Sequence, residues 1–297
     1  MSGERIAFVG LGAMGWPMAA RLVGAGFDVV GVDVRPGRAE EFAREFCASA
    51  APDPAQAAPG AAVVVTMLPA SPHVEEVLGA MRPRLAPGVL VLEMTSGQPA
   101  ATRRLAGSLA ADGIALVDAP VSGGVPRARD GTLAIMAGGD DAALDRAEPV
   151  LRAMGTTIHR VGGVGAGQAM KALNNLVSAG GFLIGVEALL IGRKFGLDPA
   201  LMVDVLNAST GMNNSTQRKF KQFVLSRSFD AGFGLDLMVK DLSIALEVGR
   251  DTATPTPFAA LCREMWAAAA AMLGPGQDHT TAARLSERLA DQELGGD

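Results

Sequence analysis

Apolar positions in the first half of the chain fall into short, continuous runs separated by segments with helical spacing. Runs of this length, bounded by Gly or Pro, are typical of parallel strands buried on both faces. We expect strands at 6–9, 29–32, 62–68, 89–94, 114–118, 132–136 and 157–160. Strands alternating with helices predict an α/β fold with a doubly wound, mostly parallel sheet.

The pattern changes after Gly162. A long apolar segment without proline runs from about Gln168 to Phe195, and Glu187 interrupts it, which favours a buried core helix over a membrane span. Further helices are expected at 201–206, 235–248, 259–273 and 280–294. We therefore predict two domains, 1–162 with the sheet and 163–297 all-helical, the second beginning with a long connecting helix.

A glycine-rich motif follows the first strand and opens a helix. It reads Gly10-Leu11-Gly12-Ala13-Met14-Gly15. In a G-x-G-x-x-G of this kind the first glycine makes a tight turn, the second lets the backbone approach a pyrophosphate, and the third packs helix on strand. A glycine-rich turn without a ligand is the alternative. The flanking strand and helix favour a Rossmann dinucleotide-binding domain.

The second strand ends in an acid, at Asp33-Val34-Arg35. A carboxylate at this position accepts hydrogen bonds from the adenosine ribose of NAD and repels the 2′-phosphate of NADP. Arg35 and Arg38 could attract that phosphate, so the residues favour NAD and leave NADP open.

Two later strand ends extend the predicted cofactor site. Ligands of doubly wound sheets lie at the carboxyl ends of the strands, which places Leu68, Pro69, Thr95 and Ser96 beside the cofactor. A helix N-cap is the alternative role for Thr95 and Ser96.

The next strand end is followed by Ser122, Gly123 and Gly124. Glycines after a serine can expose consecutive N–H groups to an anion, and a substrate carboxylate would suit them. An ordinary Gly-Pro loop is the alternative.

The glycine-rich stretch 162–167 leads into the long helix. Lys171 and Asn175 are four residues apart there and share one helix face, with Ser178 one turn further. A cation and an amide directed at one spot indicate a site. A lysine with its ordinary pKa of ~10.4 can donate a proton, but it needs a lowered pKa to act as a base.

Composition narrows the class of protein. The chain has 297 residues, is 49% hydrophobic and has a net charge of −5, which gives no support to binding of nucleic acid or an anionic membrane. Cys47 and Cys262 are isolated, and the three histidines lack metal-ligand spacing. With no apolar signal segment at the start, we expect a cytoplasmic enzyme without a metal.

Four motifs together resemble the β-hydroxyacid dehydrogenases, which include 3-hydroxyisobutyrate dehydrogenase and tartronate semialdehyde reductase. The resemblance to 6-phosphogluconate dehydrogenase is more distant. The motifs are GLGAMGWPMA at 10–19, DAPVSGG at 118–124, GAGQAMKALNN at 165–175 and KDL at 240–242.

The resemblance implies hydride transfer between NAD(P) and a small β-hydroxy acid or its semialdehyde. It implies Lys171 as the general acid/base, with Asn175 and the Ser122-Gly123-Gly124 loop on the substrate. Lys240 would lie near the cofactor, although without the resemblance it would be read as a surface lysine. The helical domain would help to form a homodimer or homotetramer.

Two features leave the substrate open. Residues 213–216 replace a Trp-containing segment of several characterised members of the family. A basic cluster at Arg218, Lys219, Lys221 and Arg227 is either a solvated helix face or a means of attracting an anionic substrate or a second acidic group on it.

Two other functions are compatible with such a fold. An imine reductase resembles it but typically has Asp or Tyr in the place of Lys171. A non-catalytic, cofactor-binding module would not need the Lys171–Asn175 pair.

Overall fold

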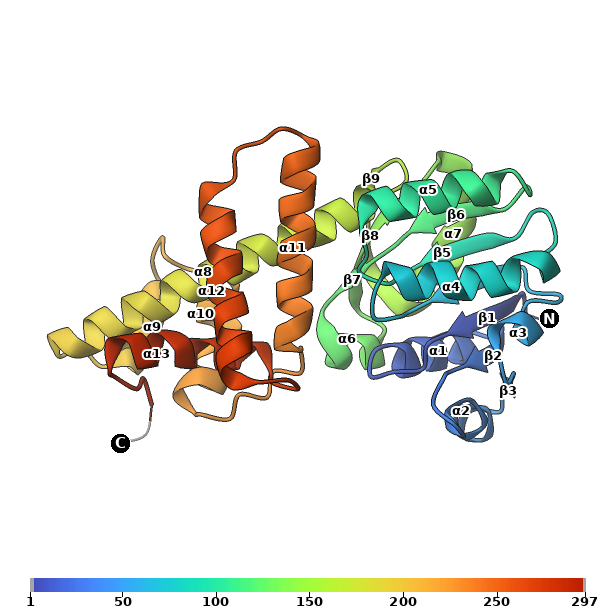
Figure 1. The fold of residues 1–297 in the computed structure, drawn as a ribbon. Helices are drawn as coiled ribbons and strands as arrows, with labels where there is room; N and C mark the ends of the chain where they lie inside the picture. The colour runs from blue at the N-terminus through green and yellow to red at the C-terminus, as the bar shows by residue number, and fades with distance from the viewer. Residues whose placement is uncertain (1–2, 296–297) are drawn as a thin grey trace. The chain divides into compact units, whose positions relative to one another are not determined.

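The structure is a computed structural model that describes residues 3–295, and the chain divides after Lys171 into two compact units. The strands of the described residues all lie in the first unit, and the second unit is helical (Figure 1). Each unit has its own apolar core.

Within residues 3–295 the first unit contains a nine-stranded sheet. The strands are β1 (Arg5–Val9), β2 (Asp28–Val32), β3 (Ser49–Ala50), β4 (Val63–Thr66), β5 (Leu90–Glu93), β6 (Ala115–Asp118), β7 (Val121–Ser122), β8 (Leu133–Gly138) and β9 (Gly155–Gly162). Their order is β3-β2-β1-β4-β5-β6-β8-β7, with β9 paired to β8. The strands from β3 to β6 are parallel, whereas β8 is antiparallel to β6. The predicted doubly wound, mostly parallel sheet is confirmed, and the sequence missed only the two-residue strands β3 and β7.

Both faces of this sheet are buried. Ile6 and Phe8 belong to one apolar cluster, and Ala7 and Val9 to another, as the alternation of side chains along a strand requires. The covering helices are α1 (Gly15–Gly24), α2 (Arg38–Phe46), α3 (Pro54–Ala57), α4 (Ser71–Met81), η1 (Arg82–Arg84), α5 (Pro99–Ala110), α6 (Gly124–Asp130) and α7 (Asp141–Met154).

The register aligns the carboxyl ends of four neighbouring strands. Val9 pairs with Thr66, Thr66 with Glu93, and Glu93 with Asp118. The loops after β1, β4, β5 and β6 therefore leave the sheet along one edge. The strand order reverses beside β1, at the point where ligands of such sheets bind.

The long helix α8 (Ala166–Phe195) begins in the first unit and continues through the second, where it is drawn in yellow-green to yellow (Figure 1). The other helices of the second unit are α9 (Pro199–Asn207), α10 (Asn214–Arg218), the π-helical turn η2 (Phe220–Leu225), α11 (Leu235–Asp251), α12 (Pro257–Leu273), η3 (His279–Ala282) and α13 (Ala283–Ala290). The helix expected at 280–294 is therefore wrong in extent. It starts as a 3-10 turn and ends at Ala290, because Asp291 has φ +47°.

The core of the second unit forms around α8. Phe182, Phe220 and Trp266 are fully buried, and a Cβ on Gly185 would lie 2.5 Å from the Phe220 ring. Gly185 therefore lets η2 approach α8 closely. By length and composition α8 could cross a membrane, with a mean hydropathy of 1.6, but 56% of that window is buried within the protein. This burial agrees with the core helix that the sequence predicts.

Candidate active site

The first glycine-rich loop has the geometry that phosphate binding requires. Gly10 has φ +102°, and a Cβ there would lie 2.3 Å from Met67 O. A Cβ on Gly15 would lie 1.8 Å from Gly10 O, whereas one on Gly12 would meet nothing within 4 Å. Met14 gives α1 no side-chain cap, so the first N–H groups of this helix suit an anion. The residues present therefore fit a dinucleotide.

Asp33, after the end of β2, holds this loop. Its carboxylate accepts hydrogen bonds from Leu11 N at 2.8 Å and from Arg35 N at 2.9 Å. Burial favours the neutral acid, but the hydrogen bonds from Arg35 and Leu11 outweigh it and lower the pKa of Asp33. The acid is ionised at neutral pH. Val34 beside it is 96% exposed.

Two guanidinium groups lie at the same loop. Arg35 Nη2 and Arg38 Nε donate to Leu11 O at 2.9 and 3.1 Å, and the Arg38 guanidinium lies 3.6 Å from the centroid of the Trp16 ring. The site thus combines Asp33, which suits a ribose diol, with two cations that suit a phosphate.

Thr95 supports the loop after β4. Leu68 N donates to Thr95 Oγ1 at 2.9 Å, and Thr95 is fully buried. The alternative that Thr95 or Ser96 caps a helix is wrong, because Gln98 is the N-cap residue of α5. Pro69 is exposed at the same edge of the sheet.

The loop after β7 also depends on glycine. Gly123 has φ +134° and Gly124 has φ +68°, and both residues are exposed. A Cβ on Gly123 would lie 2.6 Å from Arg127 Cδ. The backbone after Ser122 is therefore available to a ligand, as its predicted role requires.

The first turn of α8 is fixed to the sheet edge by two residues to which the sequence analysis gave no role. Asp118, at the end of β6, accepts hydrogen bonds from Gly165 N at 2.7 Å and Gln168 N at 2.8 Å. The Gln168 side chain accepts from Gly97 N at 2.8 Å and donates to Thr95 O at 2.7 Å. Only the strand-end position of Asp118 could have indicated this.

Lys171 lies one turn after Gln168, on the same face of α8. It is 8% exposed, and Asn175, one turn further, is 6% exposed. A buried lysine and a buried amide on one helix face match the predicted spacing. Their catalytic roles remain predictions.

Asn175 is held by α11. Its Nδ2 donates to Asp241 Oδ2 at 2.6 Å, and its Oδ1 accepts from Asn174 at 3.1 Å. Asp241 is 1% exposed, and its other oxygen lies 3.4 Å from Lys240 Nζ. The KDL motif therefore orients the amide of Asn175.

Two buried acids lie behind the strand ends. Burial raises the pKa of Glu93 to about 8, although Thr102 Oγ1 donates a hydrogen bond to it. Burial also raises the pKa of Asp118 to about 6, against the effect of the N–H groups of Gly165 and Gln168. Glu93 is therefore largely protonated at neutral pH, whereas Asp118 is largely ionised.

The basic cluster is not one solvated face. Lys221 pairs with Asp204 at 2.5 Å, and Arg227 is half-buried and pairs with Glu287. Arg218 is exposed, as the solvated reading expects. Lys219 is half-buried, and its Nζ donates to Ser178 Oγ at 3.2 Å.

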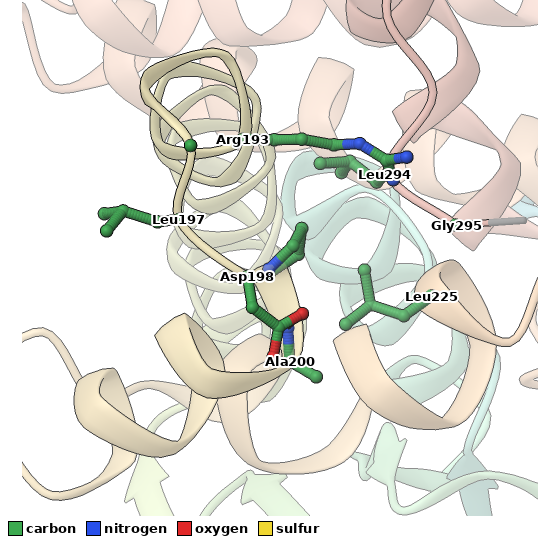
Figure 2. Close-up of a pocket in the computed structure, with 9 residues that line it drawn as sticks. Arg193, Leu197, Asp198, Ala200, Leu225, Leu294 and Gly295 are labelled. Atoms are coloured by element: carbon green, nitrogen blue, oxygen red, sulfur yellow. The ribbon is translucent and has the colours of Figure 1, made fainter. Parts of the chain in front are cut away.

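A pocket of about 460 Å³ lies elsewhere in the second unit, where α8 ends and α9 begins (Figure 2). Arg193, Asp198, Leu225 and Leu294 are among the residues that line it. Along α8, Arg193 is about 27 Å from Asn175 at 1.5 Å per residue. The pocket therefore contains none of the predicted site residues.

Comparisons with known proteins agree with this geometry. The profile of the NAD binding domain of 6-phosphogluconate dehydrogenase matches residues 5–163, and that of the NAD-binding domain of NADP-dependent 3-hydroxyisobutyrate dehydrogenase matches residues 165–286. The chain is 34% identical to 2-(hydroxymethyl)glutarate dehydrogenase of Eubacterium barkeri over 98% of both chains. It is 41% identical to 3-hydroxyisobutyrate dehydrogenase of Pseudomonas aeruginosa over 88% of this chain and 90% of that one.

The chain belongs to the β-hydroxyacid dehydrogenase family. A solved structure of Mycobacterium tuberculosis 3-hydroxyisobutyrate dehydrogenase with L-serine has a TM-score of 0.88 and 33% identity, covering 95% of this chain and 98% of that chain. The predicted resemblance is confirmed. As a β-hydroxyacid dehydrogenase, the protein is an NAD(P)-dependent oxidoreductase that acts on a CH–OH group.

Proposed function

We propose that this β-hydroxyacid dehydrogenase interconverts a small 3-hydroxy carboxylate and its semialdehyde, with Lys171 as the general acid/base. The observation that carries the proposal is the buried pair Lys171 and Asn175 on one face of α8. The first turn of that helix is bonded through Gln168 to Thr95 and Gly97, just beyond β5. This anchoring supports a position of Lys171 close to the strand ends, where a nicotinamide ring would bind.

The predicted site residues divide into those that bind the cofactor and those that bind the substrate. The Gly10–Gly15 loop and Asp33 hold the two phosphates and the adenosine ribose, and Leu68, Pro69, Thr95 and Ser96 lie along the cofactor. The backbone of Ser122, Gly123 and Gly124 holds the substrate carboxylate. Asn175, oriented by Asp241, hydrogen-bonds to the substrate, and Lys240 contacts the cofactor.

The cofactor, when bound, accepts a hydride from the alcohol carbon or returns it. Lys171 Nζ takes the hydroxyl proton as the C–H bond breaks, so the alcohol loses two electrons and two hydrogens and becomes the carbonyl. In reduction the Lys171 ammonium gives its proton to the carbonyl oxygen. Proton transfer of this kind contributes on the order of 10²–10⁴ in rate.

NAD is the proposed cofactor. The Asp33 carboxylate is ionised and would repel a 2′-phosphate, and Arg35, the nearest cation, is already paired with it. NADP remains the alternative through Arg38, whose guanidinium lies over Trp16.

We further propose a cytoplasmic protein whose assembly is built on homodimers. One face of α8 presents apolar side chains at intervals of seven residues, with Val177 76%, Ile184 56% and Ile191 72% exposed. A stripe of this kind on a surface helix suits a second copy of the chain. A homotetramer would add a further interface.

A spectrophotometric screen tests the function. The purified protein is given 3-hydroxyisobutyrate, 3-hydroxypropionate, glycerate, serine and 2-(hydroxymethyl)glutarate, each with NAD and with NADP, and reduced nicotinamide is followed by absorbance. We expect turnover of at least one acid, faster with NAD. Turnover of cyclic imines with NADPH and of none of the acids would instead identify an imine reductase. Tight cofactor binding without any turnover would identify a non-catalytic module.

A further inference from the structure

Lys219 differs from the other cations of its cluster. It lies where α10 ends and η2 begins, and it is half-buried. Among the described residues its Nζ has a hydroxyl partner, Ser178, and lies 5.8 Å from the centroid of the Phe182 ring, and no carboxylate forms an ion pair with it. Lys221, two residues on, is paired with Asp204.

Burial of this cation without an anion is costly. Burial lowers the pKa of Lys219 to about 8, and Asp278 only partly opposes this effect. The Asp278 carboxylate is itself engaged by Gly232 N at 2.7 Å and by Thr280. His279, the other titratable group near Lys219, is buried, and burial lowers its pKa, so it is neutral at physiological pH. Asp278 is therefore already occupied by other donors, and Lys219 can accept an anion of its own.

The position of Lys219 relates it to the predicted substrate residues. Ser178 lies one turn after Asn175 on the face of α8 that begins with Lys171. At 1.5 Å per residue, Ser178 is about 4.5 Å beyond Asn175 along the helix axis. A carboxylate spaced a few bonds from the reacting alcohol covers such a distance.

The segment that carries Lys219 is fixed against α8. Phe220 packs where Gly185 leaves room, and Asn213 lies against Gly181. The chain between Asn213 and Phe220 forms α10, and a π-helical turn, a conformation that often marks functional sites, begins at Phe220. Packing of this segment against α8 therefore fixes Lys219 within hydrogen-bond distance of Ser178.

We propose that Lys219, together with Ser178, binds a second anionic group of the substrate, so that the preferred β-hydroxy acids are diacids. This inference rests on the proposed function, since it assumes that Lys171 and Asn175 hold the reacting end. Lys219 is a specificity-determining residue, and the substrate class is a 3-hydroxy carboxylate whose side chain ends in a carboxylate.

The test uses substrates that differ only in this group. In 2-(hydroxymethyl)glutarate the side chain ends in a carboxylate, and in 2-(hydroxymethyl)pentanoate a methyl group replaces it, while 3-hydroxyisobutyrate has the shortest side chain. For the wild-type protein we expect kcat/KM for the diacid to exceed that for the pentanoate by about tenfold or more, mainly through KM. In Lys219→Met this ratio falls by about 10- to 100-fold, as loss of a charged hydrogen bond predicts.

Two controls separate recognition from folding. Lys221→Met, which removes a neighbouring cation that is paired with Asp204, leaves the ratio unchanged, and Lys219→Arg retains most of it. In the wild-type protein KM for the diacid rises above about pH 8 as Lys219 loses its proton. This rise is absent for the pentanoate and in Lys219→Met.

The possible results distinguish failure of this inference from failure of the proposed function. Equal kcat/KM values for diacid and pentanoate in the wild-type protein, or equal losses for both in Lys219→Met, overturn this inference while leaving the proposed function intact. Failure to oxidise any of these three acids, while serine, glycerate or 3-hydroxypropionate is oxidised, overturns this inference alone. Failure to oxidise any acid of either set, with NAD or NADP, overturns the proposed function and this inference with it.

Discussion

The Asn175 amide donates a hydrogen bond of 2.6 Å to the carboxylate of Asp241, which is 1% exposed. A buried carboxylate accepts only from donors, so it determines which way the Asn175 amide is turned. The same carboxylate lies 3.4 Å from Lys240 Nζ. One acid thus positions an amide of α8 and a cation of α11.

Replacing this acid should disturb substrate binding more than cofactor binding. In Asp241→Asn the new amide can place its NH₂ group against the NH₂ group of Asn175. Two buried donors then face each other without an acceptor, at a cost of about 1–3 kcal/mol. We expect KM for the hydroxy acid to rise about tenfold or more. Steady-state kinetics measure this, with the exposed Asp236→Asn on the same helix as the matched control. A normal KM in Asp241→Asn would show that Asp241 does not position Asn175 for the substrate.

Lys171 should be needed for turnover and dispensable for cofactor binding. Lys171→Met should lower kcat by about 10²–10⁴, because the alcohol proton then has no acceptor. Binding of NADH, followed by its fluorescence, should change little. Lys194→Met, an exposed lysine in the last turn of α8, serves as the control. Near-normal kcat in Lys171→Met would remove Lys171 from the mechanism.

The three glycines of the first loop should respond differently to alanine. A Cβ on Gly12 meets nothing within 4 Å, so Gly12→Ala should keep its melting temperature but lose about tenfold or more in NAD affinity. In Gly15→Ala the Cβ would lie 1.8 Å from Gly10 O, and the protein should be strongly destabilised. A Cβ on Gly24, at the end of the same helix, also meets nothing within 4 Å. Gly24→Ala should therefore lower neither the melting temperature nor the NAD affinity. Calorimetry and titration with NADH check these effects, and undiminished affinity in Gly12→Ala would contradict the proposed approach of the phosphates.

Glu93 should make the protein less stable as the pH rises. Its pKa is about 8 in the folded protein against 4.5 for an ordinary glutamate, so between these values the folded state holds a proton that the unfolded state releases. The free energy of unfolding therefore falls with increasing pH across this window, by at most ~1.4 kcal/mol per pH unit. Glu93→Gln keeps an acceptor for Thr102 and should flatten the profile.

Urea unfolding across about pH 5–8.5 measures this slope. The exposed Glu40→Gln is the control and should retain the wild-type profile. If Glu93→Gln keeps the wild-type slope as well, Glu93 is not protonated in the folded protein.

The sequence predicted those features of the structure that depend on residues close together along the chain. Short apolar runs predict strands, and the spacing of Gly10, Gly12 and Gly15 encodes a turn whose requirements are local. The same holds for the helical spacing of Lys171 and Asn175. These features follow from periodicity and backbone sterics, so no tertiary information was needed.

Contacts between distant segments could not be predicted in this way. Asp118 accepts a hydrogen bond from Gln168 N, fifty residues away in sequence, and no residue near Asp118 indicates this partner. Lys219 and Lys221 look alike in the sequence and are both half-buried, but Lys219 donates to Ser178 of α8 whereas Lys221 pairs with Asp204. The N-cap interpretation of Thr95 was wrong because a local rule was applied to a residue whose partner, Leu68, lies on another loop.

The continuity of α8 limits how this enzyme can be recombined with its relatives. The boundary between the two compact units falls after Lys171, inside a helix that runs from Ala166 to Phe195. A chimaera joined at that boundary would graft the first turn of one helix, with its Asp118 and Gln168 anchors, onto the body of another. A junction in the glycines at 162–165 would keep the helix whole, but Asp118 would then come from one parent and Gln168 from the other. Exchange of cofactor units should therefore succeed only where both parents share the Asp118–Gln168 pair.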